Sequence, residues 1–263
     1  MKHIPKKRFG QNFLRDRRVI QDIVAAIRPK ASDRILEIGP GEGVLTEGLL
    51  QSGAWLEVIE LDRDLVAFLQ SRFAGVERLR IHQGDALRLD IRTLAGDGRL
   101  RVVGNLPYNI STPLLFHLFA NLECIEDLHF MLQKEVVDRL CAGPGDSAYG
   151  RLSVMRALYC EAERLFDVAP ESFHPRPKVW SAVVRLIPHP EPPDPVQAER
   201  VGRVVAAAFG QRRKTLRNAL RTCLDEAAIR ACGIDPGARA ETLSLHEFIR
   251  LSGVLPTPGR PSL

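Results

Sequence analysis

The sequence has no apolar run long enough to cross a membrane and no cysteine pattern typical of a disulfide framework. Every apolar run falls short of the roughly 20 residues that a membrane-spanning helix needs, and no signal-peptide core follows the basic N-terminus. The five cysteines are scattered, odd in number and without a CxxC pair, which argues against disulfides and against a zinc site. We therefore expect a soluble cytoplasmic protein with reduced thiols and no metal.

Positive charge is concentrated in two blocks. The chain of 263 residues has a net charge of +5. Residues 1–18 contain seven basic side chains and one acidic one, and residues 211–221 contain five basic side chains and no acidic one. The rest of the chain is net acidic, so the basic blocks predict a protein that binds a polyanion. Two solvated basic faces are the alternative.

Short apolar runs alternate with amphipathic stretches from Arg34 onward. This alternation predicts a parallel sheet with helices on both faces. Two later extended segments with no helix between them predict an antiparallel pair at the sheet edge. The predicted strands are 34–38, 56–60, 79–83, 101–104, 128–132, 160–168 and 179–187, and the predicted helices are 44–50, 63–73, 113–120, 135–141 and 149–159. Asp62 is expected to cap the helix that begins at Arg63.

The proline-rich segment 188–195 predicts a stiff linker, and the chain beyond it shows only helical patterns. Helices are predicted over 196–209, 215–224, 227–232 and 245–253. We expect a domain of residues 1–190, which includes the basic segment 1–18, and an all-helical C-terminal domain of residues 191–263. We expect the protein to be a monomer.

A glycine-rich turn, Gly39-Pro-Gly-Glu-Gly43, follows the first predicted strand. Such a turn lets the backbone approach a ligand closely at the carboxyl edge of a parallel sheet. Glu60 ends the second strand and suits a ribose diol, and Asp85 follows the third strand, where it can accept a hydrogen bond from an adenine amine. A solvated acid and a turn cap are the respective alternatives. Together, the three strand ends favour a ligand that contains adenosine.

The fourth predicted strand ends in Asn105-Leu-Pro-Tyr108. The Asn105 side-chain oxygen and the Leu106 carbonyl can accept the N–H groups of an adenine amine, Pro107 stiffens the turn, and Tyr108 offers a stacking face. This arrangement would hold the amine against an activated methyl donor without a metal or a covalent nucleophile. Phe173 is a candidate for the opposite face of the base, with a core anchor of its loop as the alternative.

These segments, in this order, resemble the small-subunit ribosomal RNA adenine dimethyltransferase family over nearly the whole chain. The resemblance is carried by residues 6–14, 37–46, 58–65, 105–112, 173–186 and 209–218. It implies a Rossmann-like class I methyltransferase with a mostly parallel seven-stranded sheet and an antiparallel edge pair. S-adenosylmethionine is the implied cofactor, and the residues expected to bind it are Asn12, Leu14, Gly39, Gly41, Glu60, Leu61, Asp85, Ala86 and Asn105. Trp180 departs from the family pattern, in which a small or acidic residue is expected.

The resemblance further implies transfer of two methyl groups to each of two adjacent adenines in a hairpin loop near the 3′ end of small-subunit RNA. The implied partner is the small ribosomal subunit or its RNA during assembly. Alternatives are a large-subunit RNA methyltransferase of the antibiotic-resistance type, a relative that binds nucleic acid without catalysis, and a nicotinamide dehydrogenase. The nicotinamide dehydrogenase is the least supported of these alternatives, because Val44 stands at the third glycine position of the GxGxxG motif.

Basic side chains in both blocks are the candidates for RNA binding. Arg213, Arg217 and Arg221 have the spacing of one helical face, while Leu216 and Leu220 would pack inward. Guanidinium groups on that face would contact phosphates and position the RNA without determining sequence preference. The candidate residues are Lys6, Lys7, Arg8, Arg212, Arg213, Lys214, Arg217 and Arg221.

Overall fold

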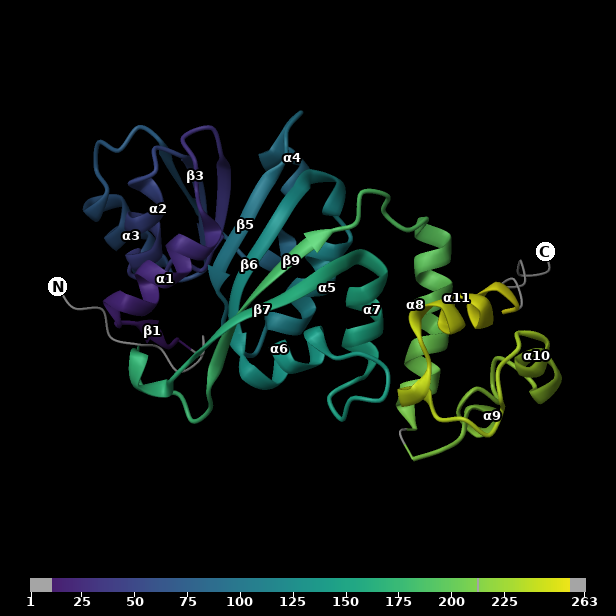
Figure 1. Cartoon of the computed structure of the whole chain (residues 1–263). Helices are drawn as coiled ribbons and strands as arrows, with labels where there is room; N and C mark the ends of the chain where they lie inside the picture. Colours follow the sequence, from purple (N-terminus) through teal and green to yellow (C-terminus); the bar gives the residue numbers. More distant parts are fainter. Residues whose placement is uncertain (1–10, 212, 256–263) are drawn as a thin grey trace. The chain divides into compact units, whose positions relative to one another are not determined.

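A computed structural model describes residues 11–211 and 213–255 (Figure 1). The chain forms two compact units by its contacts. The first consists of residues through Val137 together with Ala162–Pro188, and the second of Asp138–Glu161 together with the chain from His189 onward. This division differs from a single boundary at residue 190, because residues 138–161 pack with the C-terminal helices.

A seven-stranded sheet forms the centre of the first unit, with the strand order β4-β3-β2-β5-β6-β9-β7. The pairs β2–β3, β2–β5, β3–β4 and β5–β6 are parallel, and β9 is antiparallel to β6. The strands are β2 (Arg34–Ile38), β3 (Trp55–Glu60), β4 (Leu79–Gln83), β5 (Leu100–Asn105), β6 (Ile125–Gln133), β7 (Cys160–Val168) and β9 (Ser181–Pro188). The predicted mostly parallel sheet with its antiparallel edge is confirmed.

The order in which the chain adds strands to the sheet reverses at β2. The chain continues from β2 to β3 and β4 on one side, and later returns to place β5 on the other side of β2. Such a switch point opens a crevice at the carboxyl ends of the strands, where ligands bind in open α/β sheets. Helices cover both faces of the sheet (Figure 1). The helices of the first unit are α1 (Arg17–Ile27), α2 (Val44–Leu50), α3 (Arg63–Arg72), α4 (Ile91–Ala95) and α5 (Ser111–Phe119), while α6 (Lys134–Cys141) begins in this unit and ends in the second.

Two short strands attach the N-terminal segment to the first unit. β1 (Phe13–Leu14) pairs antiparallel with β8 (Phe173–His174). Arg15 and Asp16 donate their backbone N–H groups to the carbonyl of Ser172, at 2.8 and 3.3 Å. The Asp16 side chain then caps α1, as the side chain of Asp62 caps α3 in the predicted way.

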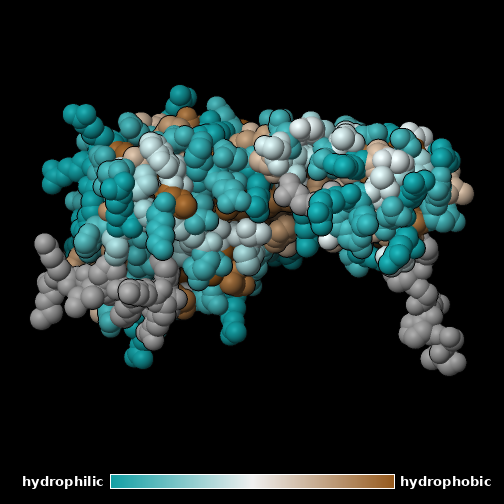
Figure 2. Space-filling model, turned by 90° about the horizontal axis from the view of Figure 1, so that it is seen from below, coloured by the Kyte–Doolittle hydropathy of each residue, from teal (hydrophilic) through white to brown (hydrophobic). Residues whose placement is uncertain are grey.

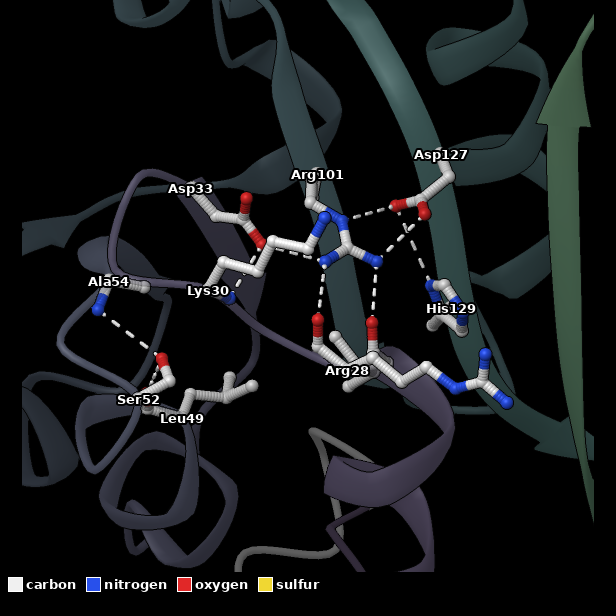
Figure 3. A network of polar contacts seen from close by, with 10 residues as sticks. Arg28, Lys30, Asp33, Leu49, Ser52, Ala54, Arg101, Asp127 and His129 are labelled. Atoms are coloured by element: carbon white, nitrogen blue, oxygen red, sulfur yellow. Dashed lines mark hydrogen bonds and ion pairs between the residues drawn. The ribbon is translucent and has the colours of Figure 1, made fainter.

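The C-terminal end of α1 is held by Arg101, a buried residue of β5 (Figure 3). Its guanidinium donates to the carboxylates of Asp127, at 2.8 and 3.0 Å, and Asp33, at 2.7 Å. It also donates to the carbonyls of Ile27, at 2.6 Å, and Arg28, at 3.4 Å. The last carbonyls of a helix have no partner within the helix, and α1 has no basic residue in its own last turn. Arg101 therefore supplies both the donors and the positive charge that this helix end favours.

The second unit contains α7 (Arg151–Tyr159), α8 (Pro195–Gly210), α9 (Leu216–Ala219), α10 (Glu226–Ala231) and α11 (Leu245–Gly253). The buried Tyr149 side chain explains why the segment before α7 belongs here. Its hydroxyl donates to the carbonyl of Leu243 at 2.8 Å. Its ring packs on Phe209, with centroids 6.0 Å apart, and Phe209 lies 5.8 Å from Phe248.

The predicted helix over 215–224 is wrong in length, since α9 ends at Ala219. Leu216, Leu220 and Leu224 are all buried, as predicted for the first two. Their four-residue spacing fits a continuous helix and also the observed short helix followed by a turn, in which Cys223 and Leu224 donate to the carbonyl of Leu220. The apolar pattern alone therefore could not locate the end of this helix.

The surface in Figure 2 is mainly hydrophilic, with separate small apolar patches. Across residues 11–211 and 213–255, no helix has the length and apolar character needed to span a bilayer.

Candidate active site

A cavity of about 370 Å³ lies at the carboxyl ends of the central strands of the first unit. Its walls come from the segment around β1, the glycine turn after β2, the ends of β3 and β4, and the turn after β5. All nine residues predicted to bind the cofactor line it, as do Leu106, Pro107 and Tyr108. The volume is in the range of ~300–1,000 Å³ that small-molecule sites occupy.

The glycine turn forms one wall because its backbone adopts conformations that favour glycine. Gly39, Gly41 and Gly43 all have positive φ, at 69°, 58° and 75°. A side chain at Gly41 would also meet the ring of Phe13 at 3.1 Å. The turn and β1 therefore pack directly on each other, and a side chain at Gly41 would require the Phe13 ring to shift by a few tenths of an ångström.

Glu60 lies at the end of β3 with its carboxylate fixed by backbone donors. Gly41 N–H donates to one oxygen at 3.2 Å and Asp62 N–H donates to the other at 2.9 Å. Burial raises the pKa of Glu60, and these hydrogen bonds partly oppose that rise. Each carboxylate oxygen has a second lone pair with which it can accept from a ligand hydroxyl.

Asp85 lines the same cavity and also caps a short 3₁₀ turn, Ala86–Arg88. One carboxylate oxygen accepts from the backbone N–H of Leu87 at 3.0 Å. The alternative interpretation of Asp85 as a turn cap is therefore confirmed. The cap also fixes the position of the carboxyl group beside the cavity.

The turn after β5 is tied to the N-terminal wall. The Asn105 amide nitrogen donates to the carbonyl of Asn12 at 3.2 Å, which directs the amide and leaves its oxygen as an acceptor. Leu106 N–H donates to the carbonyl of Met131 at 3.2 Å. The Tyr108 hydroxyl lies 2.7 Å from the Ser181 hydroxyl, and burial raises the pKa of Tyr108. Both ends of the turn are thus held by neighbouring elements.

Phe173 differs from the other predicted catalytic residues. It is buried, packs in the core with Leu14, Met131 and Val183, and is absent from the residues that line the cavity. In this structure its ring has no face available for a base. The alternative interpretation, an anchor of its loop, agrees with this position, because β8 holds β1 in place.

Glu37, near the end of β2, also lines the cavity, although it is not among the residues predicted from the sequence. Its side chain is buried and accepts from the Thr46 hydroxyl at 2.6 Å. Burial raises the pKa of Glu37 from 4.5 to about 7, with a lowering contribution from Thr46 and a further rise from Glu60. The sequence signal was an acidic residue between apolar neighbours, Leu36 and Ile38, in a strand of a parallel sheet, because both faces of such a sheet are buried.

Replacing Glu37 by glutamine is expected to stabilise the ligand-free protein at pH 8 more than at pH 5. The folded protein retains the Glu37 proton up to about pH 7, whereas the unfolded chain loses it near pH 4.5. The free energy of unfolding of the wild type therefore decreases as the pH rises from 4.5 to about 7. Above this range the folded protein contains an ionised buried carboxylate. The gain of Glu37→Gln over the wild type should rise across this window to at most about 3 kcal/mol.

Urea unfolding at both pH values measures this difference. Glu77→Gln, which removes a charge from an exposed site, is the control and should change stability by about 0.5 kcal/mol or less. A Glu37→Gln gain that is equal at pH 5 and pH 8 would contradict the raised pKa.

The predicted RNA-binding residues fall into two groups. Lys6, Lys7, Arg8 and Arg212 lie outside the described residues. Arg213, Lys214, Arg217 and Arg221 are exposed in the second unit. They do not form the predicted helical face, because only Arg217 lies within α9. Of the residues that the structure describes, none belong to a cluster of metal-binding side chains.

Comparisons with known proteins agree with the resemblance seen in the motifs. Residues 2–256 match the model of a family described as ribosomal RNA adenine dimethylase. The chain is 71% identical over 252 residues to a ribosomal RNA small subunit methyltransferase A of Methylococcus capsulatus, which covers 96% of this chain and 98% of the relative. It is 55% identical over 262 residues to the protein of the same description in Pseudomonas fluorescens, with 99% and 97% covered.

Two solved structures are similar to this chain over most of its length. One is a dimethyladenosine transferase from Plasmodium falciparum, with a TM-score of 0.75, 25% identity, and 92% of this chain and 99% of that chain covered. The other is the 23S rRNA methyltransferase ErmE, with a TM-score of 0.72, 26% identity, and 92% and 98% covered.

Proposed function

The chain belongs to the ribosomal RNA adenine dimethylase family, and we propose that it methylates two adjacent adenines in a hairpin loop near the 3′ end of small-subunit ribosomal RNA. It transfers two methyl groups from S-adenosylmethionine to the N6 amine of each adenine. The substrate is an assembling small subunit in the cytoplasm, and the enzyme acts as a monomer. The observation that carries the proposal is that the predicted cofactor residues and the Asn105–Tyr108 turn line one cavity.

The hydrogen-bond acceptors that line the cavity suit S-adenosylmethionine. Glu60 faces it with a fixed carboxylate that can accept from ribose hydroxyls, and Asp85 is placed to accept from the adenine amine. Asn12 and Leu14 line the wall formed by the N-terminal segment, and Gly39 and Gly41 line the adjoining glycine turn. When bound, the cofactor supplies a methyl group that its sulfonium activates for transfer.

The side chains of this chain then position the target amine. The Asn105 side-chain oxygen and the Leu106 carbonyl accept hydrogen bonds from its N–H groups, two before the first transfer and one before the second, which draws the nitrogen lone pair out of conjugation with the ring. Tyr108 provides a face on which the adenine stacks, and stacking helps to offset the few kcal/mol needed to remove a base from its neighbours. Orientation of the two reactants is the main source of the rate increase.

The decisive experiment supplies labelled S-adenosylmethionine with unmethylated small subunits, with large subunits and with protein-free RNA in separate reactions. We expect label in adenines of the small subunit. Label confined to the large subunit would favour the antibiotic-resistance type, and no transfer to any RNA would favour a non-catalytic relative. Thermal protection by S-adenosylmethionine and not by NAD excludes a dehydrogenase independently of the RNA substrate.

Binding to RNA should weaken steeply with salt if the exposed basic residues of the second unit contact phosphates. Each contact lowers log K by about 0.7–0.9 per log unit of salt. In a salt titration of binding to unmethylated small subunits, Arg217→Gln and Arg221→Gln are each expected to reduce the slope of log K against log salt concentration by the contribution of about one phosphate contact. Arg230→Gln is the matched control, because Arg230 is exposed but paired with Glu226 at 2.8 Å. An unchanged slope in both variants would remove these residues from the RNA interface.

A further inference from the structure

Trp180 is an exposed aromatic residue immediately before β9, adjacent to the catalytic turn. Its side chain is 51% exposed. The next residue, Ser181, is fully buried, and its hydroxyl lies 2.7 Å from that of Tyr108. Consecutive Cα atoms are about 3.8 Å apart, so the backbone that carries Trp180 is fixed close to the proposed adenine site.

Among the described residues, no ring or cation covers the indole of Trp180, although its backbone is held. Its carbonyl accepts from the backbone N–H of Lys134 at 2.9 Å. Over residues 11–211 and 213–255, no aromatic ring or cation contacts the indole. Trp55, also about half exposed, differs because the Arg78 guanidinium covers its ring at 5.7 Å. A half-exposed indole on a fixed backbone is a ready surface for stacking.

Lys178 adds an available positive charge two residues away. Lys178, Val179 and Trp180 are exposed in succession. The neighbouring cations are neutralised, since Arg176 pairs with Glu171 and Lys134 pairs with Asp167. Lys178 forms no ion pair with any residue that the structure describes. An aromatic face next to a free ammonium group is the combination that binds a base and its phosphate in single-stranded nucleic acid.

We propose that Trp180 stacks on an unpaired base that neighbours the adenine being methylated, with Lys178 beside the connecting phosphate. This inference rests on the proposed function. Removal of the target adenine from its stack leaves the adjacent base without a neighbour, and the exposed indole replaces the lost stacking partner. Trp180 thereby contributes to binding of the RNA and has no part in the transfer of the methyl group.

The test compares Trp180→Ala with Trp55→Ala, which removes a similarly exposed tryptophan at the start of β3. Methyl transfer to unmethylated small subunits is measured over a range of subunit concentrations. Trp180→Ala is expected to raise KM for the subunit roughly tenfold with kcat nearly unchanged, which is the signature of lost uniform binding. Trp180→Phe should recover most of the loss, and Trp55→Ala should match the wild type.

Tryptophan emission gives a readout that does not depend on turnover. In a Trp55→Phe protein, the only indole is that of Trp180, and its emission should be quenched by small subunits and also by a synthetic hairpin RNA with two adjacent loop adenines. Quenching by subunits but not by the hairpin would assign the indole to a ribosomal protein and overturn the proposal. Equal KM values for Trp180→Ala and Trp55→Ala would also overturn it, as would a failure of Trp180→Phe to recover binding.

The two hypotheses fail in different ways. If the proposed function is wrong, the wild type itself transfers no label to small-subunit adenines. If only the stacking inference is wrong, the wild type is active and Trp180→Ala behaves as Trp55→Ala does.

Discussion

Replacing Asn105 by alanine is expected to lower kcat for methyl transfer at least about a hundredfold, because it removes an acceptor that orients the amine. Loss of one fixed polar group that stabilises a reacting centre typically costs ~10²–10³ in kcat. Binding of the RNA should be largely preserved, since the basic residues of the second unit and Tyr108 remain. Single-turnover transfer with bound small subunits measures the chemical step directly.

Asn109→Ala is the matched control for this prediction. Asn109 also lines the cavity but lies beyond the Asn105–Tyr108 turn, and its loss should change kcat only a few-fold. Asn105 also bonds the Asn12 carbonyl, so affinity for S-adenosylmethionine must be measured in parallel. Near-normal transfer by Asn105→Ala would refute the assigned role, whereas a loss that saturating cofactor restores would assign Asn105 to the cofactor wall instead.

The Arg101→Met variant is expected to lose about 3–5 kcal/mol of stability, the usual effect of removing one member of a buried ion pair. Methionine fills a similar volume but leaves the buried Asp127 carboxylate and the partly buried Asp33 carboxylate without the guanidinium, together with the carbonyl of Ile27. Urea unfolding measures the loss. Hydrogen exchange should show that α1 opens more readily, because its last turn loses the donors that Arg101 supplied.

Arg92→Met is the control, since Arg92 pairs with Glu123 at 2.6 Å on an exposed surface. Exposed pairs contribute about 0–1 kcal/mol, so this variant should remain close to the wild type. The double variant Arg101→Met with Asp127→Leu should be more stable than Arg101→Met alone, because it removes a stranded charge. Equal stability of Arg101→Met and Arg92→Met would show that the network in Figure 3 contributes little.

The sheet and its site were largely predictable because they depend on local patterns. Apolar runs separated by amphipathic stretches identified every strand of the large sheet, and β2, β4 and β7 have the predicted bounds. Residues at the ends of parallel strands converge at one edge regardless of details elsewhere. Glu60, Asp85 and Asn105 could therefore be assigned to one cavity from the sequence alone.

Features that depend on contacts distant in sequence were not predictable. The pairing of β1 with β8 joins two-residue segments without a periodic pattern of their own. Burial of Phe173 follows from that pairing, and a proline-rich loop gives no sign of which way an aromatic ring faces. The assignment of residues 138–161 to the second unit likewise depends on the ring of Tyr149 meeting Phe209. The early end of α9 was hidden by buried leucines that suit either conformation.

The pairing of β1 with β8 also has a consequence for biosynthesis. The segment that forms one wall of the cavity emerges from the ribosome about 160 residues before its partner strand. At roughly 5–20 residues per second, synthesis of the intervening residues takes on the order of ten seconds or more, and β1 has no partner strand during this time. A polypeptide released before residue 173 would therefore carry the glycine turn and the Asn105–Tyr108 turn without the strand that pairs with β1, and only contacts such as that of Asn105 with the Asn12 carbonyl would hold the N-terminal segment over them.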